Sequence, residues 1–230
     1  MRSLDFAKIL FCVLAAMLTG CGISVIRPPS ASAFMNDDGN FNFYGSYHIL
    51  GKPDKDARKL RVPADAKEKD YSYSSSEWVV DFGGAFQQRI GNFKLGGGLD
   101  FLTPVVQAGY VTDYLGVMGW SNFILWKPHK RDFDYFQWGG GISLIEQLPF
   151  ENVKIGLTQH LSRNGAEGLK RETYAMFSAC SAPVFYDEVG GGTFISFVLG
   201  KSIKLGVEFR YGRDLTFDKN RYTIVLDFME

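Results

Sequence analysis

The sequence predicts an all-β protein, a closed antiparallel up-and-down transmembrane β-barrel of about ten strands, within a range of about eight to twelve. Two patterns carry this prediction. Apolar residues alternate with polar or small residues in segments about as long as a membrane-crossing strand, and beyond residue 40 no segment shows the 3.6-residue apolar period of a helix. The range reflects residues 101–126, which can be divided into strands in more than one way.

Residues 1–20 have the composition of an export signal. Arg2 and Lys8 precede a short apolar run, which is too short to span a bilayer that needs about 20 apolar residues. The run ends in Leu-Thr-Gly-Cys at residues 18–21, which resembles the lipobox of bacterial lipoprotein signal peptides. The resemblance implies cleavage before Cys21, a diacylglycerol on its thiol and a further acyl chain, such as palmitate, on its new amino group.

Residues 21–40 are predicted to form a lipidated tether. They contain Pro28-Pro29 and no apolar periodicity, as is typical of linkers. Several acyl chains on Cys21 would anchor the chain durably, since each buried CH₂ contributes about 0.8 kcal/mol. Residue 22 is Gly rather than Asp, which by the sorting rule of enteric lipoproteins indicates the outer membrane, with the lipid in its periplasmic leaflet and the lipoprotein-sorting machinery as a partner.

Residues 41–230 are predicted to form the barrel. Alternation is clearest near the end of the chain, where Leu205 and Val207 share one face of a strand and Lys204 and Glu208 share the other. The predicted strands span residues 41–50, 77–87, 92–101, 114–126, 134–146, 153–158, 172–184, 193–201, 203–212 and 222–228.

The polar face decides between a membrane barrel and a soluble one. In a soluble lipocalin-like carrier the apolar face points inward, whereas in a transmembrane barrel it meets lipid and the interior is polar or small. Glycine runs at residues 96–98, 139–141 and 190–192 fit a crowded interior. Aromatic residues near strand ends fit two interfacial girdles, although aromatic residues also fill soluble β cores. The membrane barrel is therefore favoured.

Across residues 41–230 the chain resembles a bacterial outer-membrane β-barrel. Its segment Tyr222–Phe228 resembles the C-terminal strand by which such barrels are recognised for assembly, although Met229 and Glu230 follow the aromatic residue here. The resemblance implies outer-membrane lipids, lipopolysaccharide and the barrel-assembly machinery as partners. The charged segment at residues 52–76 and the basic one at 127–131 are either solvated loops or contacts to lipid phosphates.

Charge and cysteine content exclude several classes. Formal net charge is zero and no extended basic run occurs, so nucleic acid is not expected as a partner. Of the three cysteines, Cys12 leaves with the signal and Cys21 is the lipid site, which leaves Cys180 without a disulfide partner.

No metal site or cofactor is expected either. The three histidines are scattered along the chain, and no glycine run has the sequence context of a phosphate-binding loop.

One stretch suggests catalysis. Residues 159–165, Gln-His-Leu-Ser-Arg-Asn-Gly, resemble the His-x-Ser-Asn motif of outer-membrane phospholipase A and lipid A deacylases. The resemblance implies His160 as base and Ser162 as nucleophile on one strand face, with Glu172, or less plausibly Asn164 or Glu167, orienting the ring.

The match to these hydrolases departs from the family pattern in three ways. Arg163 separates the serine from the asparagine, and Tyr174 stands where the family has Asn or Glu. The alternation also turns His160 and Ser162 toward the lumen, whereas the related hydrolases present theirs to lipid.

Three functions remain open. The leading hypothesis is a lipid-anchored outer-membrane barrel with a structural, adhesive or small-solute permeation role. The second is an outer-membrane esterase that acts on phospholipid or lipid A through His160 and Ser162. The third is a lipocalin-like carrier tethered by Cys21. The facing of Leu205 and Lys204 discriminates barrel from carrier, and the sequence does not predict an oligomeric state.

Overall fold

The structure is a computed structural model, and it describes residues 26–36, 41–49, 71–73, 78–100, 103–124, 137–171, 182–199 and 203–230. In these residues it contains one short helix, α2 (Ala31–Phe34), and eleven strands. The strands are β1 (Phe41–Ile49), β2 (Tyr71–Tyr73), β3 (Trp78–Ile90), β4 (Phe93–Asp100), β5 (Thr103–Val111), β6 (Leu115–Ile124), β7 (Gln137–Pro149), β8 (Val153–Arg171), β9 (Ala182–Leu199), β10 (Ile203–Asp214) and β11 (Lys219–Met229). No helix of this described part is long and apolar enough to cross a membrane.

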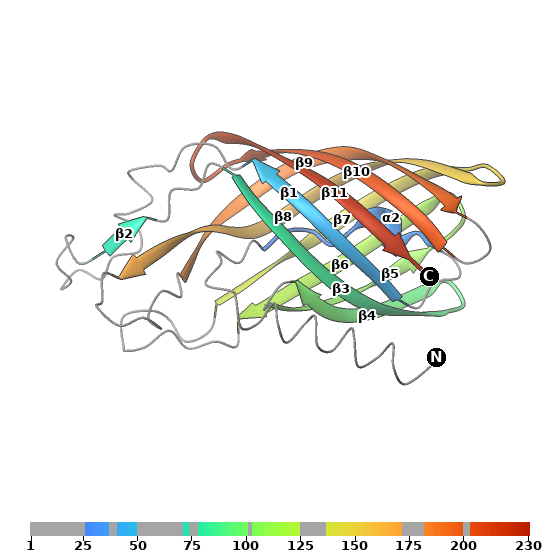
Figure 1. Ribbon diagram of the computed structural model, residues 1–230, viewed down its shortest axis with the longest axis horizontal. Coiled ribbons are helices and arrows are strands. Elements are labelled where there is room, and N and C mark those ends of the chain that lie inside the picture. The colour runs from blue at the N-terminus through green and yellow to red at the C-terminus, as the bar shows by residue number, and fades with distance from the viewer. Residues whose placement is uncertain are drawn as a thin grey trace.

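Ten of the described strands form a closed ring, β1 and β3 to β11. Each pairs antiparallel with the next along the chain, and β11 pairs with β1 from Asn42↔Met229 to Ile49↔Tyr222, which closes the barrel. The short strand β2 pairs with the far end of β8, beyond the ring (Figure 1). The up-and-down barrel predicted from the sequence is confirmed.

The two faces of the sheet are inverted relative to a soluble barrel. On β10, Glu208 is fully buried while the neighbouring Phe209 is 46% exposed, and on β11 Asp227 is fully buried while Leu226 is 46% exposed. Charged side chains therefore point inward and apolar ones outward, as in a transmembrane barrel. This arrangement contradicts the lipocalin-like carrier, which requires the apolar face to line the interior.

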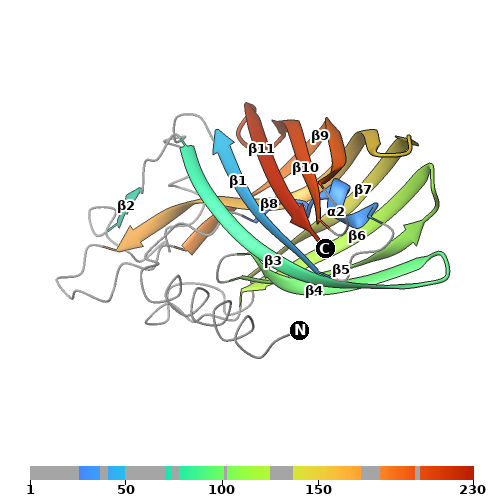
Figure 2. The same cartoon turned by 45° about the vertical axis from the view of Figure 1, so that its right-hand side comes forward.

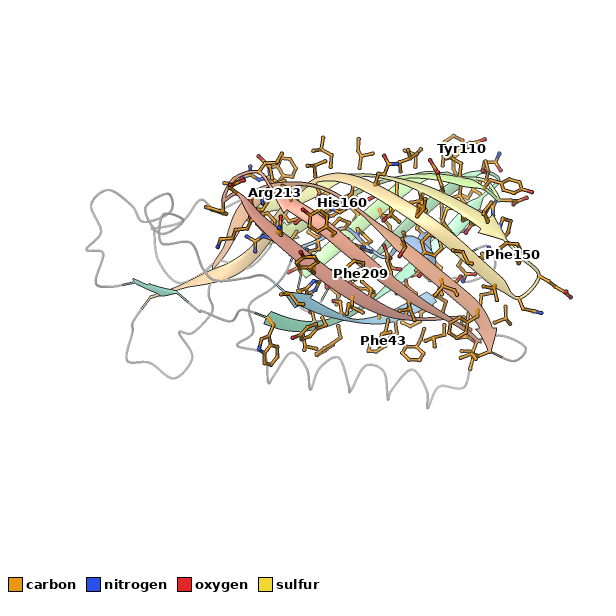
Figure 3. The ribbon with its side chains drawn as sticks, turned by 90° about the horizontal axis from the view of Figure 1, so that it is seen from above. Phe43, Tyr110, Phe150, His160, Phe209 and Arg213 are labelled. Atoms are coloured by element: carbon orange, nitrogen blue, oxygen red, sulfur yellow. The ribbon has the colours of Figure 1, made fainter. Side chains whose placement is uncertain are left out.

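Exposed aromatic side chains gather at both ends of the outer face. Tyr47 stacks on Trp78 near one end, with ring centroids 6.0 Å apart, and Phe93 meets Tyr110 edge to face near the other, at 5.7 Å. Figure 3 shows Tyr110 on the outside of the barrel. Two such groups at the two ends fit the predicted girdles, although Phe82 and Phe209 are also exposed in mid-strand.

The two ends of the barrel differ in their connections. Turns of two or three residues join the strands at one end, at residues 91–92, 112–114, 150–152 and 200–202. In the first of these, Gly91 adopts a φ of +62°, a left-handed conformation that favours glycine. The start of β1 and the end of β11 lie at this same end. We call it the short-turn end, and the opposite one, with connections of up to 28 residues, the long-loop end.

Two strand assignments made from the sequence were wrong, although the number of barrel strands agrees. Thr103–Val111 is a separate strand, β5, which had no place in the predicted set, because Val105 and Val111 point inward and obscure the alternation. Conversely, β9 continues without a break from Ala182 to Leu199, where two strands were predicted. The glycines 190–192 lie in mid-strand and pair on both sides, with β8 and β10.

Residues 26–36 lie inside the barrel. Except for the half-buried Pro29, every one of them is buried, and α2 sits within the ring of strands (Figure 2). Composition assigned this stretch to a tether, and the described part of it instead packs against the barrel wall. We call residues 26–36 the plug.

Candidate functional site in the barrel interior

The plug runs along the interior from one end of the barrel to the other. At its start, Ile26 exchanges backbone hydrogen bonds with Gly165 of β8, its N–H donating over 2.6 Å and its carbonyl accepting over 3.0 Å. At its end, the side-chain oxygen of Asn36 accepts a hydrogen bond of 2.6 Å from Lys204 of β10. Gly165 lies toward the long-loop end and Lys204 beside a short turn, so the plug spans the lumen.

Acidic side chains of the wall bind the start of α2. The backbone N–H of Ala31 donates to Glu208 over 3.0 Å, and Ser32 donates to Asp227 over 2.7 Å. Ser30 caps the helix by accepting from the N–H of Ala33 and also donates to Asp227. Carboxylates thus meet the end of the helix whose N–H groups lack intrahelical acceptors.

Lysine side chains of the wall bind the other end of α2. Lys94 donates to the carbonyls of Ala33, Phe34 and Asn36 over 3.2, 2.8 and 2.6 Å, and Lys154 donates to that of Met35 over 3.3 Å. Carbonyls at the end of a helix lack the usual intrahelical donors, and the ammonium groups bind them here; the carbonyl of Ala33 also accepts from the N–H of Asn36 over 3.2 Å.

These lysines occupy equivalent places in the wall. Lys94, Lys154 and Lys204 are each the second residue of a strand that leaves the short-turn end. They therefore form a ring of positive charge around the end of the plug.

Two arginines fix the stretch of the plug that precedes α2. Arg210 of β10 donates to the carbonyls of Pro28 and Pro29, the latter over 2.8 Å, and pairs with Glu208 over 2.6 Å. Arg27 of the plug donates to Thr223 over 3.0 Å. Prolines have no N–H of their own to donate, and the guanidinium of Arg210 satisfies their buried carbonyls.

The opposite side of the lumen carries an apolar cluster beside buried polar side chains such as Gln107, Asn122 and Gln147. Ile26, Phe34 and Met35 of the plug pack in one buried cluster with residues of β5, β6, β7 and β9. The wall residues of this cluster are Val111, Met118, Trp120, Ile145, Phe185 and Phe194. The plug therefore contacts mainly charged groups on one side and an apolar cluster on the other.

Three glycines of the wall make room for plug side chains. A Cβ atom added at Gly116 would lie 2.5 Å from the sulfur of Met35, and at Gly206 it would lie 2.5 Å from the hydroxyl of Ser32. At Gly139 it would lie 2.5 Å from Ile26. The prediction that glycines serve a crowded interior applies here, and the crowding comes from the plug.

The proposed catalytic residues do not assemble as a triad in the described part of the chain. His160 and Ser162 both point into the lumen, as the alternation predicted, and His160 bonds Glu188 of β9 over 2.9 Å (Figure 3). The hydroxyl of Ser162 is buried and has no hydrogen-bond partner among the described residues. Serine and histidine are therefore not joined as a nucleophile and its base would be.

Several predicted site residues lie outside the described residues. Glu172, the expected orienting group, is one of them, and Cys21 is another. Asn164, an alternative to Glu172, is described and buried, but its amide has no hydrogen-bond partner there. Glu188 holds the histidine instead, and only the pairing of β8 with β9, which sets Ser162 opposite Glu188, could have revealed it.

A second serine and histidine pair escaped the sequence analysis. On β1 the hydroxyl of Ser46 lies 2.9 Å from His48 Nε2, and His48 Nδ1 lies 3.0 Å from the Thr223 hydroxyl. Their spacing of two residues was a signal available in the sequence. Within the part of the chain that the structure describes, no carboxylate is hydrogen-bonded to this ring, so the pair lacks the orienting acid of a triad there.

A cavity of about 20 Å³ lies between the plug and the wall, lined by Ser46, His48 and Arg210 among others. Such a volume holds about one water molecule. Among the described residues no group of three or more His, Cys, Asp or Glu side chains could hold a metal ion.

Comparison with known proteins gives no family. No protein-family model matches the chain, and no curated protein matches it. Among solved structures it is similar to Neisserial surface protein A, NspA, with 15% identity, 83% of this chain and 96% of that chain covered, and a TM-score of 0.38. It is also similar to the N-terminal β-barrel domain of Pseudomonas aeruginosa OprF, with 6% identity, 84% and 98% covered, and a TM-score of 0.35.

Proposed function

We propose that this chain is a lipid-anchored protein of the bacterial outer membrane whose barrel lumen is blocked by its own plug. Its role is structural or adhesive, and it does not conduct solutes. The observation that carries this proposal is the occupied lumen, in which charged groups of the wall bind the plug on one side and apolar groups pack on the other.

The plug is bound through groups that solute flow would have to displace. Lys94 holds three backbone carbonyls and Arg210 holds two. Releasing the plug would leave these buried donors and acceptors unpaired, at a cost of about 1–3 kcal/mol for each group that stays dry. This binding of the plug in the lumen favours a blocked barrel over a solute-conducting pore.

The outer face supports the membrane location. In hydrocarbon every backbone polar group needs an internal partner, and a closed antiparallel ring supplies one to each residue of the wall. The apolar belt would then contact outer-membrane lipids and lipopolysaccharide. We further propose that Cys21 carries the lipid, and that the lipoprotein-sorting and barrel-assembly machineries deliver and insert the chain.

The esterase has less support. His160 is hydrogen-bonded to Glu188 and lies with Ser162 on the luminal face, which a lipid in the surrounding membrane does not reach.

Solute flux through purified protein in liposomes tests the closed barrel. We expect no swelling above that of protein-free vesicles with a sugar as small as a pentose. The combined variant Lys94→Met and Arg210→Met, which loosens the plug, should admit the sugar if it still forms a barrel. Steady permeation through the wild-type protein, equal to that of the variant, would overturn the proposal.

A further inference from the structure

We infer that the chain leaves the barrel interior at the long-loop end, so that the lipid on Cys21 lies in the outer leaflet of the membrane. This inference rests on the proposed function, which supplies the lipid and the outer membrane. Its own content is the direction of the plug, which the described residues fix.

The first residue of the plug lies near the long-loop end. Ile26 pairs with Gly165, which stands twelve residues along β8 from Val153 at the short-turn end. At about 3.3 Å per residue and a tilt of about 40°, that is roughly 30 Å along the barrel axis. The apolar band of such barrels is only about 25 Å tall, so Ile26 lies at its far edge.

The last residues of the plug lie at the opposite end. Asn36 contacts Lys94 and Lys204, each one residue from the beginning of its strand. The chain then enters β1 at Phe41, beside Met229 and the short turns. The plug therefore runs from the long-loop end to the short-turn end, and β1 returns along the wall.

The distance from Ile26 limits where Cys21 can lie. Five residues separate the two, and a fully extended chain spans at most about 17 Å over that length. A return to the short-turn end requires roughly 30 Å.

The side of the membrane on which each barrel end lies then determines the leaflet that holds the lipid. Barrels of the outer membrane carry short turns on the periplasmic side and longer loops outside. The long-loop end is therefore extracellular, and the acyl chains on Cys21 enter the outer leaflet. This replaces the expectation drawn from the sequence, which placed the lipid in the periplasmic leaflet.

Thiol labelling of intact cells tests this inference. In a Cys180→Ala background, Ser24→Cys places a reporter three residues from the lipid site. Leu215→Cys, in the β10–β11 turn and 58% exposed, marks the long-loop end, and Glu151→Cys, exposed in the β7–β8 turn, marks the short-turn end. A membrane-impermeant maleimide is added to cells of an outer-membrane-bearing host before and after permeabilisation.

We expect Ser24→Cys and Leu215→Cys to label as strongly in intact cells as after permeabilisation, and Glu151→Cys to label only afterwards. If Ser24→Cys follows Glu151→Cys, the inference is overturned. The shift of the folded band in unheated gel electrophoresis confirms that each variant forms a barrel.

A separate readout distinguishes this failure from failure of the proposed function. Cells are fed an alkyne analogue of palmitate, with Cys21→Ala as the control. Incorporation into the wild-type chain together with labelling of Ser24→Cys only after permeabilisation overturns the outer leaflet and leaves the anchor in place. Absence of incorporation overturns the anchor, and the leaflet assignment with it.

Discussion

The two sides of the lumen hold the plug by different physical means. On the side of β4, β10 and β11, charged groups bind its backbone through directed hydrogen bonds. On the side of β5, β6, β7 and β9, side chains such as Met118 and Ile145 pack against it in an apolar cluster, and Arg27 pairs there with Glu188 of β9 over 3.8 Å. The same eleven residues therefore contact mainly ionic groups on one side and mainly apolar groups on the other.

The two sides of the lumen determine different properties of the plug: the direction in which it runs and the side chains that it can accommodate. Carboxylates bind the N–H groups at the start of α2, and lysines bind the carbonyls at its end. If the plug ran in the opposite direction, its carbonyls would face the carboxylates and its N–H groups would face the lysines. Apolar contacts have no such sense and instead depend on volume. The ionic side thus specifies which way the segment runs, and the apolar side specifies which side chains fit.

The largest effect is expected for Arg210→Met. The change removes the bonds to Pro28 and Pro29 and leaves Glu208 buried without its ionic partner. The free energy of unfolding should fall by about 3–5 kcal/mol, measured by urea titration in detergent micelles. Arg213→Met is the control, since its pair with Asp218 is exposed and contributes about 1 kcal/mol or less. Equal losses in the two variants would contradict the ionic role of the wall.

Lys94→Met should have the next largest effect. It leaves the carbonyls of Ala33, Phe34 and Asn36 without this donor, at a cost of about 2–3 kcal/mol. Lys204→Met is the matched comparison, because that lysine is only half-buried and binds the side chain of Asn36. The same urea titration measures both, and a smaller loss for Lys94→Met would reverse the expected order.

On the apolar side, Gly116→Ala should cost about 1–2 kcal/mol, because the new methyl group meets the sulfur of Met35. Met35→Ala in the same chain should remove much of this penalty, which a double-mutant cycle measures. Gly119→Ala is the control: the nearest atom to its Cβ is 3.7 Å away, an ordinary contact. An uncoupled pair would mean that the plug does not press on Gly116.

The smallest effect is expected for Ser162→Ala. Its hydroxyl has no partner among the described residues, so the free energy of unfolding should change by less than about 0.5 kcal/mol. His160→Ala should cost more, since it removes a bond to the buried Glu188. Fatty-acid release from phospholipid is assayed in parallel, and activity in the wild type that Ser162→Ala abolishes would revive the esterase.

Sequence alone predicted the wall well, because the alternation along β10 and β11 reports directly which side chains point inward. It failed where both faces are apolar, as along β5 with Val105 and Val111 inside. The inward facing of His160 was predicted by the same alternation and is confirmed.

The plug was beyond such reasoning for a different reason. Its Ser-Ala-Ser-Ala stretch has no periodicity of its own, and its partners Lys94, Glu208 and Asp227 lie 58 residues or more away. A one-turn helix is unstable in isolation, so only the tertiary contacts make it visible. Glu188 was missed likewise, since pairing between strands rather than spacing brings it to His160.

The enclosure of Ile26 within hydrogen-bonded walls has a consequence for biogenesis. With the proposed lipid on Cys21, the terminus would be too bulky to pass through a lumen that one peptide segment already occupies. The plug would therefore have to take its position before the sheet closes, and β11 would pair with β1 around it afterwards. Under the proposed lipidation, lipid attachment, placement of the plug and pairing of β11 with β1 would have to occur in that order.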